Sequence, residues 1–167
     1  MKTINYIYGR YDHHAQHSGY DQIVKYIAGQ KVESRIFLNV LNRLPQGLVK
    51  GLRQRAYNTC YHNENLAREL KIALLIIMKE KNFYHFLYGD NDYSLLRIFS
   101  GLRGNAIVST YHQPPRFLDQ QLVSKGHLKH LDGIIAVASN QIPYFKQYIK
   151  EDRIFFVPHG VDINFFH

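Results

Sequence analysis

His112 lies shortly after an apolar stretch and before two prolines, in the run Tyr111-His112-Gln113-Pro114-Pro115-Arg116. The apolar stretch 106–108 is typical of a buried strand, and prolines cannot continue a sheet, so the strand is expected to end here. In open α/β sheets, ligands bind at the carboxyl ends of the strands. An imidazole there can donate, accept or shuttle a proton near neutral pH. We therefore predict that His112 is catalytic and that Gln113 and Arg116 bind substrate. A structural histidine bonded to the backbone is the alternative.

A second candidate site lies in the loop between the first expected strand and the first expected helix, at Ser18 and Gly19. A glycine lets a ligand approach the backbone closely, and the free amides at a helix N-terminus favour a phosphate group. Ser18 and Gly19 are therefore predicted to bind a diphosphate, although an ordinary turn into a helix is equally compatible. His13, His14 and His17 precede them without an obvious further ligand, so solvated or anion-binding histidines are favoured over a metal site.

The sequence Asp90-Asn91-Asp92 follows the third expected strand. It has the D-x-D spacing that some sugar-nucleotide enzymes use to hold a divalent cation, which prefers carboxylate oxygens. The same side chains can accept hydrogen bonds from substrate hydroxyls or cap the next helix. We favour these readings, with Asp90 and Asn91 binding substrate and no metal.

Strands and helices alternate along the chain, which would position these loops. Apolar runs predict strands over residues 3–8, 34–38, 83–88, 106–110, 133–138 and 154–157. Apolar spacing predicts helices near 20–27, over 63–81, over 93–99, over 117–128, and after Ser139 as an N-cap. The inner face of the long helix is expected at Leu66, Leu70, Leu74 and Ile77, with its second half deeply buried. The alternation predicts an α/β fold with a Rossmann-like, doubly wound, mostly parallel sheet and helices on both faces.

Composition restricts the partners. The chain has 167 residues, a net charge of +8 and one cysteine, Cys60. Positive charge favours anionic partners such as phosphorylated substrates or an anionic membrane surface. Lys50, Arg53 and Arg55 alternate with apolar residues and are the candidate membrane contact, with a solvated helix face as the alternative. No nucleic-acid-binding signature is present.

The expected location follows from the cysteine content and the apolar runs. The lack of a possible internal disulfide favours a reducing compartment. The longest apolar run is too short to span a membrane, and the N-terminus lacks the apolar core of a signal peptide. We expect a cytoplasmic protein that is either soluble or peripheral at the inner face of the membrane.

Four features, in this order, resemble the N-terminal half of a retaining glycosyltransferase of the GT-B fold, in the large family 4 group. They are Ser18-Gly19 opening the first helix, the run Ser109-Thr110-Tyr111-His112, the strand from Leu131 to Ser139, and Val157-Pro158-His159-Gly160-Val161-Asp162 with Phe165. The resemblance spans nearly all of the chain, and its order and spacing are more specific than any single piece.

The resemblance implies an acceptor-side domain over 1–158 and the start of an interdomain linker over 159–167, marked by Gly160 and Asp162. His112 matches a family histidine that contacts the transferred sugar or the acceptor. Gly19 matches a glycine where the backbone approaches the donor diphosphate, while Ser18 replaces a glycine that the family often has there. The donor is expected to be a nucleotide-diphosphate sugar held by a second domain, so this chain alone should bind no cofactor and be inactive.

Three alternatives remain open from the sequence. One is another GT-B-fold enzyme, such as a sugar-nucleotide epimerase. Another is a metal-dependent transferase that uses Asp90 and Asp92. The third is a non-catalytic domain that binds carbohydrate or a membrane.

Overall fold

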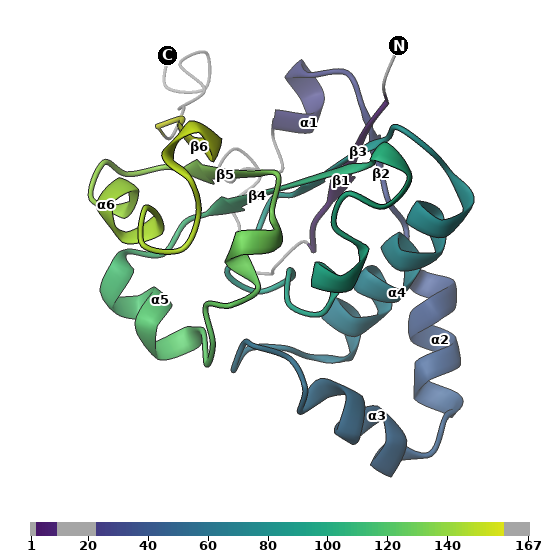
Figure 1. The fold of residues 1–167 in the computed structure, drawn as a ribbon. Helices are drawn as coiled ribbons and strands as arrows, with labels where there is room; N and C mark the ends of the chain where they lie inside the picture. Colours follow the sequence, from purple (N-terminus) through teal and green to yellow (C-terminus); the bar gives the residue numbers. More distant parts are fainter. Residues whose placement is uncertain (1–2, 10–22, 159–167) are drawn as a thin grey trace, which may run out of the picture.

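Six parallel strands form one sheet in the computed structural model, which describes residues 3–9 and 23–158 (Figure 1). Their order across the sheet is β2-β1-β3-β4-β5-β6. This arrangement confirms the predicted Rossmann-like α/β fold. The strands are β1 (Ile4–Ile7), β2 (Gln30–Lys31), β3 (Phe83–Phe86), β4 (Ala106–Tyr111), β5 (Gly133–Ala136) and β6 (Ile154–Phe156).

Helices connect the strands. The α-helices are α1 (Ile23–Tyr26), α2 (Arg35–Arg43), α3 (Gln46–Arg53), α4 (Asn63–Met78), α5 (Pro115–Gln121) and α6 (Gln141–Phe145). Short 3-10 helices are η2 (Leu96–Phe99), η3 (Leu102–Gly104), η4 (Leu128–His130) and η5 (Glu151–Arg153). In Figure 1, α1 lies above the sheet, and α4 and α5 lie below it.

The two faces of the sheet are distinguished by alternate residues of β1, as the pleat of a strand requires. Ile7 belongs to the main apolar core, which also contains residues of α4, α5 and α6. Tyr6, its neighbour, belongs to a smaller cluster that packs against Ile23 and Val24. The sheet is therefore covered from both sides, with most of the buried apolar side chains on the α4 face.

A separate apolar cluster joins α2 and α3 to the first half of α4. Its buried members are Leu41, Val49, Tyr61, Leu66 and Ala67. In Figure 1, α2 runs beside α4 and α3 extends below them, away from the sheet. Because α4 runs back from the carboxyl edge of the parallel sheet, its first turn lies at the edge where ligands bind in this class of fold.

The predicted strand at 34–38 is wrong, because these residues begin α2. Phe37, Leu38 and Leu41 are spaced as one face of a helix and pack against α4, and this tertiary contact overrides the β-propensity of the short apolar run. The second strand is instead β2, whose two exposed residues pair with Asn5 and Tyr6 of β1.

The long helix was predicted correctly, but its inner face was not. Leu66 is buried as expected, whereas Leu70, Leu74 and Ile77 are 37%, 40% and 52% exposed. The buried positions are instead Ile72 and Ile76, which lie on the same side of α4 as polar residues of its first half. A nearly all-apolar second half therefore did not indicate deep burial, because only one side of the helix meets the sheet.

Smaller differences concern the ends of elements. The helix expected over 93–99 is only the 3-10 turn η2, and α5 is shorter than expected and begins earlier. The predicted N-cap at Ser139 is also wrong: the residue preceding α6 is Asn140, and no side chain caps that helix. Within the described ranges, no helix is both long and apolar enough to cross a membrane.

Candidate functional site

The His112 loop lies at the carboxyl end of β4 and is held from two sides. On one side, the Asp90 carboxylate accepts hydrogen bonds from the backbone N–H groups of His112, at 2.9 Å, and Gln113, at 3.3 Å. Asp90 follows β3, the neighbouring strand, and is 4% exposed. Burial raises the pKa of Asp90 to about 6, while the bonds from His112 and Gln113 oppose that rise.

On the other side, the Gln141 side chain fixes the same loop. Its Nε2 donates to the backbone oxygens of Tyr111, at 3.0 Å, and Gln113, at 2.8 Å. Its Oε1 accepts from the backbone N–H groups of Val137 and Ala138, where β5 has just ended. Gln141 is fully buried and thereby joins the ends of two adjacent strands. Gln141 was not predicted as a functional residue from the sequence, where its only signal is an amide side chain at the start of an apolar helix.

The His112 ring is oriented by contacts with the end of β3. Its Nε2 lies 2.7 Å from the carbonyl oxygen of Leu87. A carbonyl can only accept, so Nε2 carries the proton, and Nδ1 is the acceptor atom of the neutral ring. The ring also packs on Tyr88 at a centroid distance of 4.9 Å. His112 is partly exposed, so its imidazole is held in a fixed orientation at the surface of the sheet edge.

A second histidine, His85, lies in β3 and bonds through Nε2 to the Thr110 hydroxyl at 2.8 Å. Burial, followed by the proximity of His112, lowers the pKa of His85 to about 4. His85 is therefore neutral at physiological pH.

The two aspartates of the D-x-D sequence serve different parts of the protein. Both Asp90 oxygens face backbone amides, whereas Asp92 is fully buried and binds Arg68, with Nη2 at 2.6 Å and Nε at 2.7 Å. Asn65 also donates to Asp92, at 2.9 Å. Among residues 3–9 and 23–158, no group of three or more His, Cys, Asp or Glu side chains is arranged to hold a metal ion.

Asn65, Arg68 and Glu69 attach the first half of α4 to the loop after β3. The two Glu69 oxygens accept the backbone N–H groups of Ser94, at 2.6 Å, and Leu95, at 2.7 Å. Burial raises the pKa of Glu69 to about 8, although these bonds lower it in part. The sequence does contain a signal for these residues. Arg68 and Glu69 follow Asn65 by three and four positions, which places polar side chains on one side of the helix.

The remaining predicted residues are distributed around this edge. Gln113 is exposed in the loop after β4, and Arg116 is exposed in the first turn of α5. Asn91 accepts from Gln121 Nε2 through its side-chain oxygen, at 2.6 Å, and from Asn65 through its backbone oxygen, at 3.1 Å. The structure thus brings His112, Asp90, Asn91 and Gln113 together. The predicted residues outside the described ranges are Ser18, Gly19, Gly160, Asp162 and the three histidines at 13, 14 and 17.

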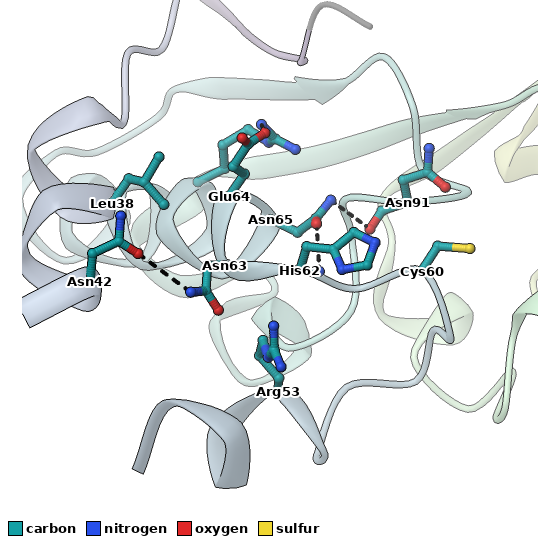
Figure 2. Close-up of a pocket in the computed structure, with 10 residues that line it drawn as sticks. Leu38, Asn42, Arg53, Cys60, His62, Asn63, Glu64, Asn65 and Asn91 are labelled. Atoms are coloured by element: carbon teal, nitrogen blue, oxygen red, sulfur yellow. Dashed lines mark hydrogen bonds and ion pairs between the residues drawn. The ribbon is translucent and has the colours of Figure 1, made fainter. Parts of the chain in front are cut away.

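A pocket of about 600 Å³ opens beside this edge, between α2, α3 and the first turn of α4 (Figure 2). We call it the α3–α4 pocket. Its lining residues are Leu38, Asn42, Arg53, Cys60, His62, Asn63, Glu64, Asn65, Arg68 and Asn91. Of the basic residues predicted to contact a membrane, Arg53 lines this pocket, whereas Lys50 and Arg55 are exposed outside it.

Comparison of the chain with protein-family models and with curated proteins gives no match.

Proposed function

We propose that this chain is the acceptor-side domain of a nucleotide-sugar-dependent glycosyltransferase that transfers a sugar to a hydroxyl acceptor in glycan, glycolipid or polysaccharide synthesis. In the reaction, an acceptor hydroxyl attacks the anomeric carbon, a new C–O bond forms, and the nucleotide diphosphate leaves with the bonding electrons. The donor is the nucleotide-diphosphate sugar, bound mainly by a second domain.

The observation that carries the proposal is the fixed His112 imidazole at the carboxyl edge of a parallel sheet. Ligands of this fold class bind at that edge. Asp90 and Gln141 hold the backbone on both sides of His112, so the ring does not depend on a mobile loop for its position. Such fixed placement is what electrostatic stabilisation of a transition state requires. His112 is proposed to orient the reacting hydroxyl, with Ser18 and Gly19 proposed to contact the leaving diphosphate.

We also propose that the protein is cytoplasmic and works at the inner face of the membrane through α2 and α3. These helices carry four cations, and Arg55 follows α3, whereas residues 34–63 contain no acidic residue. Ile36 and Leu48 expose 77% and 55% of their surface on the same pair of helices. Exposed apolar side chains combined with positive charge favour an anionic lipid surface.

The proposed function is tested by replacing His112 in the protein that carries this domain together with its donor-binding domain. We expect His112→Ala to lower the rate of sugar transfer by about 10²-fold, the order lost when a positioning group is removed. The loop should remain in place, because its hydrogen bonds to Asp90 and Gln141 use backbone atoms.

The matched control is His130→Ala, on η4 and away from the sheet edge, which should transfer sugar at the wild-type rate. The melting temperature of both variants is measured to exclude unfolding. Wild-type transfer by His112→Ala would contradict the assignment.

A further inference from the structure

The α3–α4 pocket contains buried polar atoms that lack hydrogen-bond partners among residues 3–9 and 23–158. They are the Arg53 Nε, which is a donor, and the Asn63 side-chain oxygen, which is an acceptor. The Asn63 amide nitrogen is already used, since it donates to Asn42 at 3.4 Å. Leaving a buried donor or acceptor unpaired costs free energy, so such atoms are normally satisfied by another group. A donor and an acceptor left together in a pocket point to a ligand that offers both.

Arg53 is the pocket's uncompensated cation. Arg68, the other guanidinium in the lining, is bound to Asp92 and lies 3.8 Å from Glu64. Arg53 forms no ion pair with any residue in the described part of the chain. In Figure 2 its side chain points from α3 toward the first turn of α4, where His62 and Asn63 lie. A guanidinium in that position matches the oxygens of a phosphate group.

The surroundings reinforce this preference. Residues 34–63 supply two walls of the pocket and contain no acidic residue. Their cations are Arg35, Arg43, Lys50, Arg53 and Arg55. The charged lining of the pocket is Arg53, Arg68 and one carboxylate, Glu64, which lies 3.8 Å from Arg68. The cations of 34–63 outside the lining add to the positive potential around it, which attracts anionic ligands.

The rest of the lining suits hydroxyl groups. Asparagine side chains from three segments of the chain line the pocket: Asn42, Asn63, Asn65 and Asn91. The Asn65 side chain is buried and is already bonded to His62, Asn91 and Asp92, so it is not available to a ligand. The Asn42 oxygen accepts from Asn63, which leaves the Asn42 amide nitrogen as a donor beside the unpartnered Asn63 oxygen as an acceptor. A polyol hydroxyl needs such a donor and acceptor. A pocket of about 600 Å³ also falls in the range of small-molecule sites.

We propose that the α3–α4 pocket binds a phosphorylated polyol, with the phosphate on Arg53 and the hydroxyls on the Asn42 and Asn63 amides. The identification of this ligand as the acceptor substrate rests on the proposed function, whereas its binding does not. Asn91 lines the pocket and its neighbour Asp90 holds His112, so a ligand there would lie beside the His112 loop. The ligand is either a free sugar phosphate or the head group of a phospholipid.

The pocket contains its own reporter, because Cys60 lines it, is exposed, and is the only cysteine of the chain. The experiment follows alkylation of Cys60 by iodoacetamide in the 167-residue chain. The ligands are glucose 6-phosphate, glucose, inorganic phosphate, and vesicles of phosphatidylcholine with or without phosphatidylglycerol. We expect glucose 6-phosphate or the phosphatidylglycerol vesicles to slow the alkylation at lower concentrations than glucose or inorganic phosphate.

Two variants decide whether the protection arises in the pocket. Arg53→Gln should require a ligand concentration at least about tenfold higher, because it removes a charge-assisted hydrogen bond. Arg55→Gln removes the same charge two residues away, outside the lining, so glucose 6-phosphate should protect Cys60 in this variant as in the wild type. With the phosphatidylglycerol vesicles, Arg55→Gln should weaken the protection less than Arg53→Gln does. Protection by the sugar phosphate alone identifies a free ligand, and protection by the vesicles alone identifies a lipid head group.

The proposal is overturned if neither ligand class slows alkylation at millimolar concentration, or if Arg53→Gln and Arg55→Gln behave alike. The latter result would indicate general attraction to a basic surface. The proposed function fails separately: His112→Ala should keep the ligand's protection of Cys60 while losing transfer. If a ligand protects Cys60 but the protein transfers no sugar, the pocket remains a binding site and the proposed glycosyltransferase function is refuted.

Discussion

Asp90 accepts hydrogen bonds from the backbone N–H of His112 through both carboxylate oxygens, at 2.9 Å and 3.2 Å. The two residues are 22 positions apart and follow neighbouring strands of the sheet. This bond makes Asp90 a positioning residue for the His112 loop, whereas the sequence analysis assigned it to substrate.

Replacing Asp90 tests this role. Asp90→Ala leaves the N–H groups of His112 and Gln113 without their buried acceptor, so we expect the free energy of unfolding to fall by about 2–3 kcal/mol. Asp90→Asn keeps one acceptor oxygen, so its free energy of unfolding should fall by less than that of Asp90→Ala. Urea unfolding at pH 7 measures both. Asp152→Ala, at an exposed position on η5, is the control and should stay within about 0.5 kcal/mol of the wild type. Equal stability of Asp90→Ala and the control would show that the loop does not depend on Asp90.

His127 provides a prediction about acid stability. Its ring is fully buried and stacks on Tyr57, with centroids 5.5 Å apart, while Tyr93 lies 5.6 Å away. Burial lowers the pKa of His127 to about 4. Between pH 6.5 and 4 the unfolded chain therefore binds a proton that the folded chain does not, so the protein loses stability as the pH falls through this window.

The variant His127→Phe keeps an aromatic ring but cannot titrate. Between pH 7 and pH 4.5, its free energy of unfolding should fall by about 2 kcal/mol less than that of the wild type. The difference between the two proteins is the quantity to measure, by urea unfolding at each pH. Glu69 acts in the opposite direction, because its pKa is raised to about 8 in the folded chain. The free energy of unfolding therefore falls as the pH rises from 4.5 to 8. Both proteins contain Glu69, so this contribution cancels when they are compared. Parallel pH curves for the two proteins would refute the prediction.

Gly89, just after β3, has no room for a side chain. A Cβ added there would overlap the Ser109 hydroxyl and lie 2.9 Å from the Tyr111 ring. Both neighbours are fully buried in β4, so they cannot move aside easily. We expect Gly89→Ala to lower the free energy of unfolding by about 2 kcal/mol or more.

Gly51 provides the contrasting substitution. It lies in α3, and an added Cβ would meet no atom within 4 Å. Gly51→Ala should therefore stabilise the protein by about 0.5–1 kcal/mol, since alanine is the better helix former. Thermal unfolding of the two variants should shift in opposite directions. An unchanged or raised melting temperature for Gly89→Ala would show that close packing at the end of β3 does not require glycine. A lowered one for Gly51→Ala would contradict the prediction for α3.

Apolar runs in the sequence were sufficient to predict most of the sheet. The runs at 106–110 and 133–138 became β4 and β5, because a strand covered on both faces is mostly apolar along its length. The same reasoning placed His112 at a strand end, where the structure finds it. It failed at 34–38, where a short apolar run did not distinguish a strand from the start of α2.

The partners of the polar residues were not predictable in the same way. Gln141 reaches residues 28 and 30 positions earlier in the chain, and Glu69 reaches amides 25 and 26 positions later. Nothing in the neighbouring sequence marks such contacts, because they exist only when distant segments are brought to one sheet edge. The exposed apolar residues of α4 were unpredictable for the same reason. Whether a residue of this helix is buried depends on which segments pack against it, and not on how apolar the helix is.

The sequence by itself therefore determined the class of fold and the location of His112, because strand-forming runs and prolines act locally on the backbone. Only the tertiary structure decided that Asp90 and Gln141 hold the His112 loop and that Arg53 faces a pocket beside it. Those relationships depend on hydrogen bonds and burial between segments far apart in the chain, which no local pattern of residues specifies.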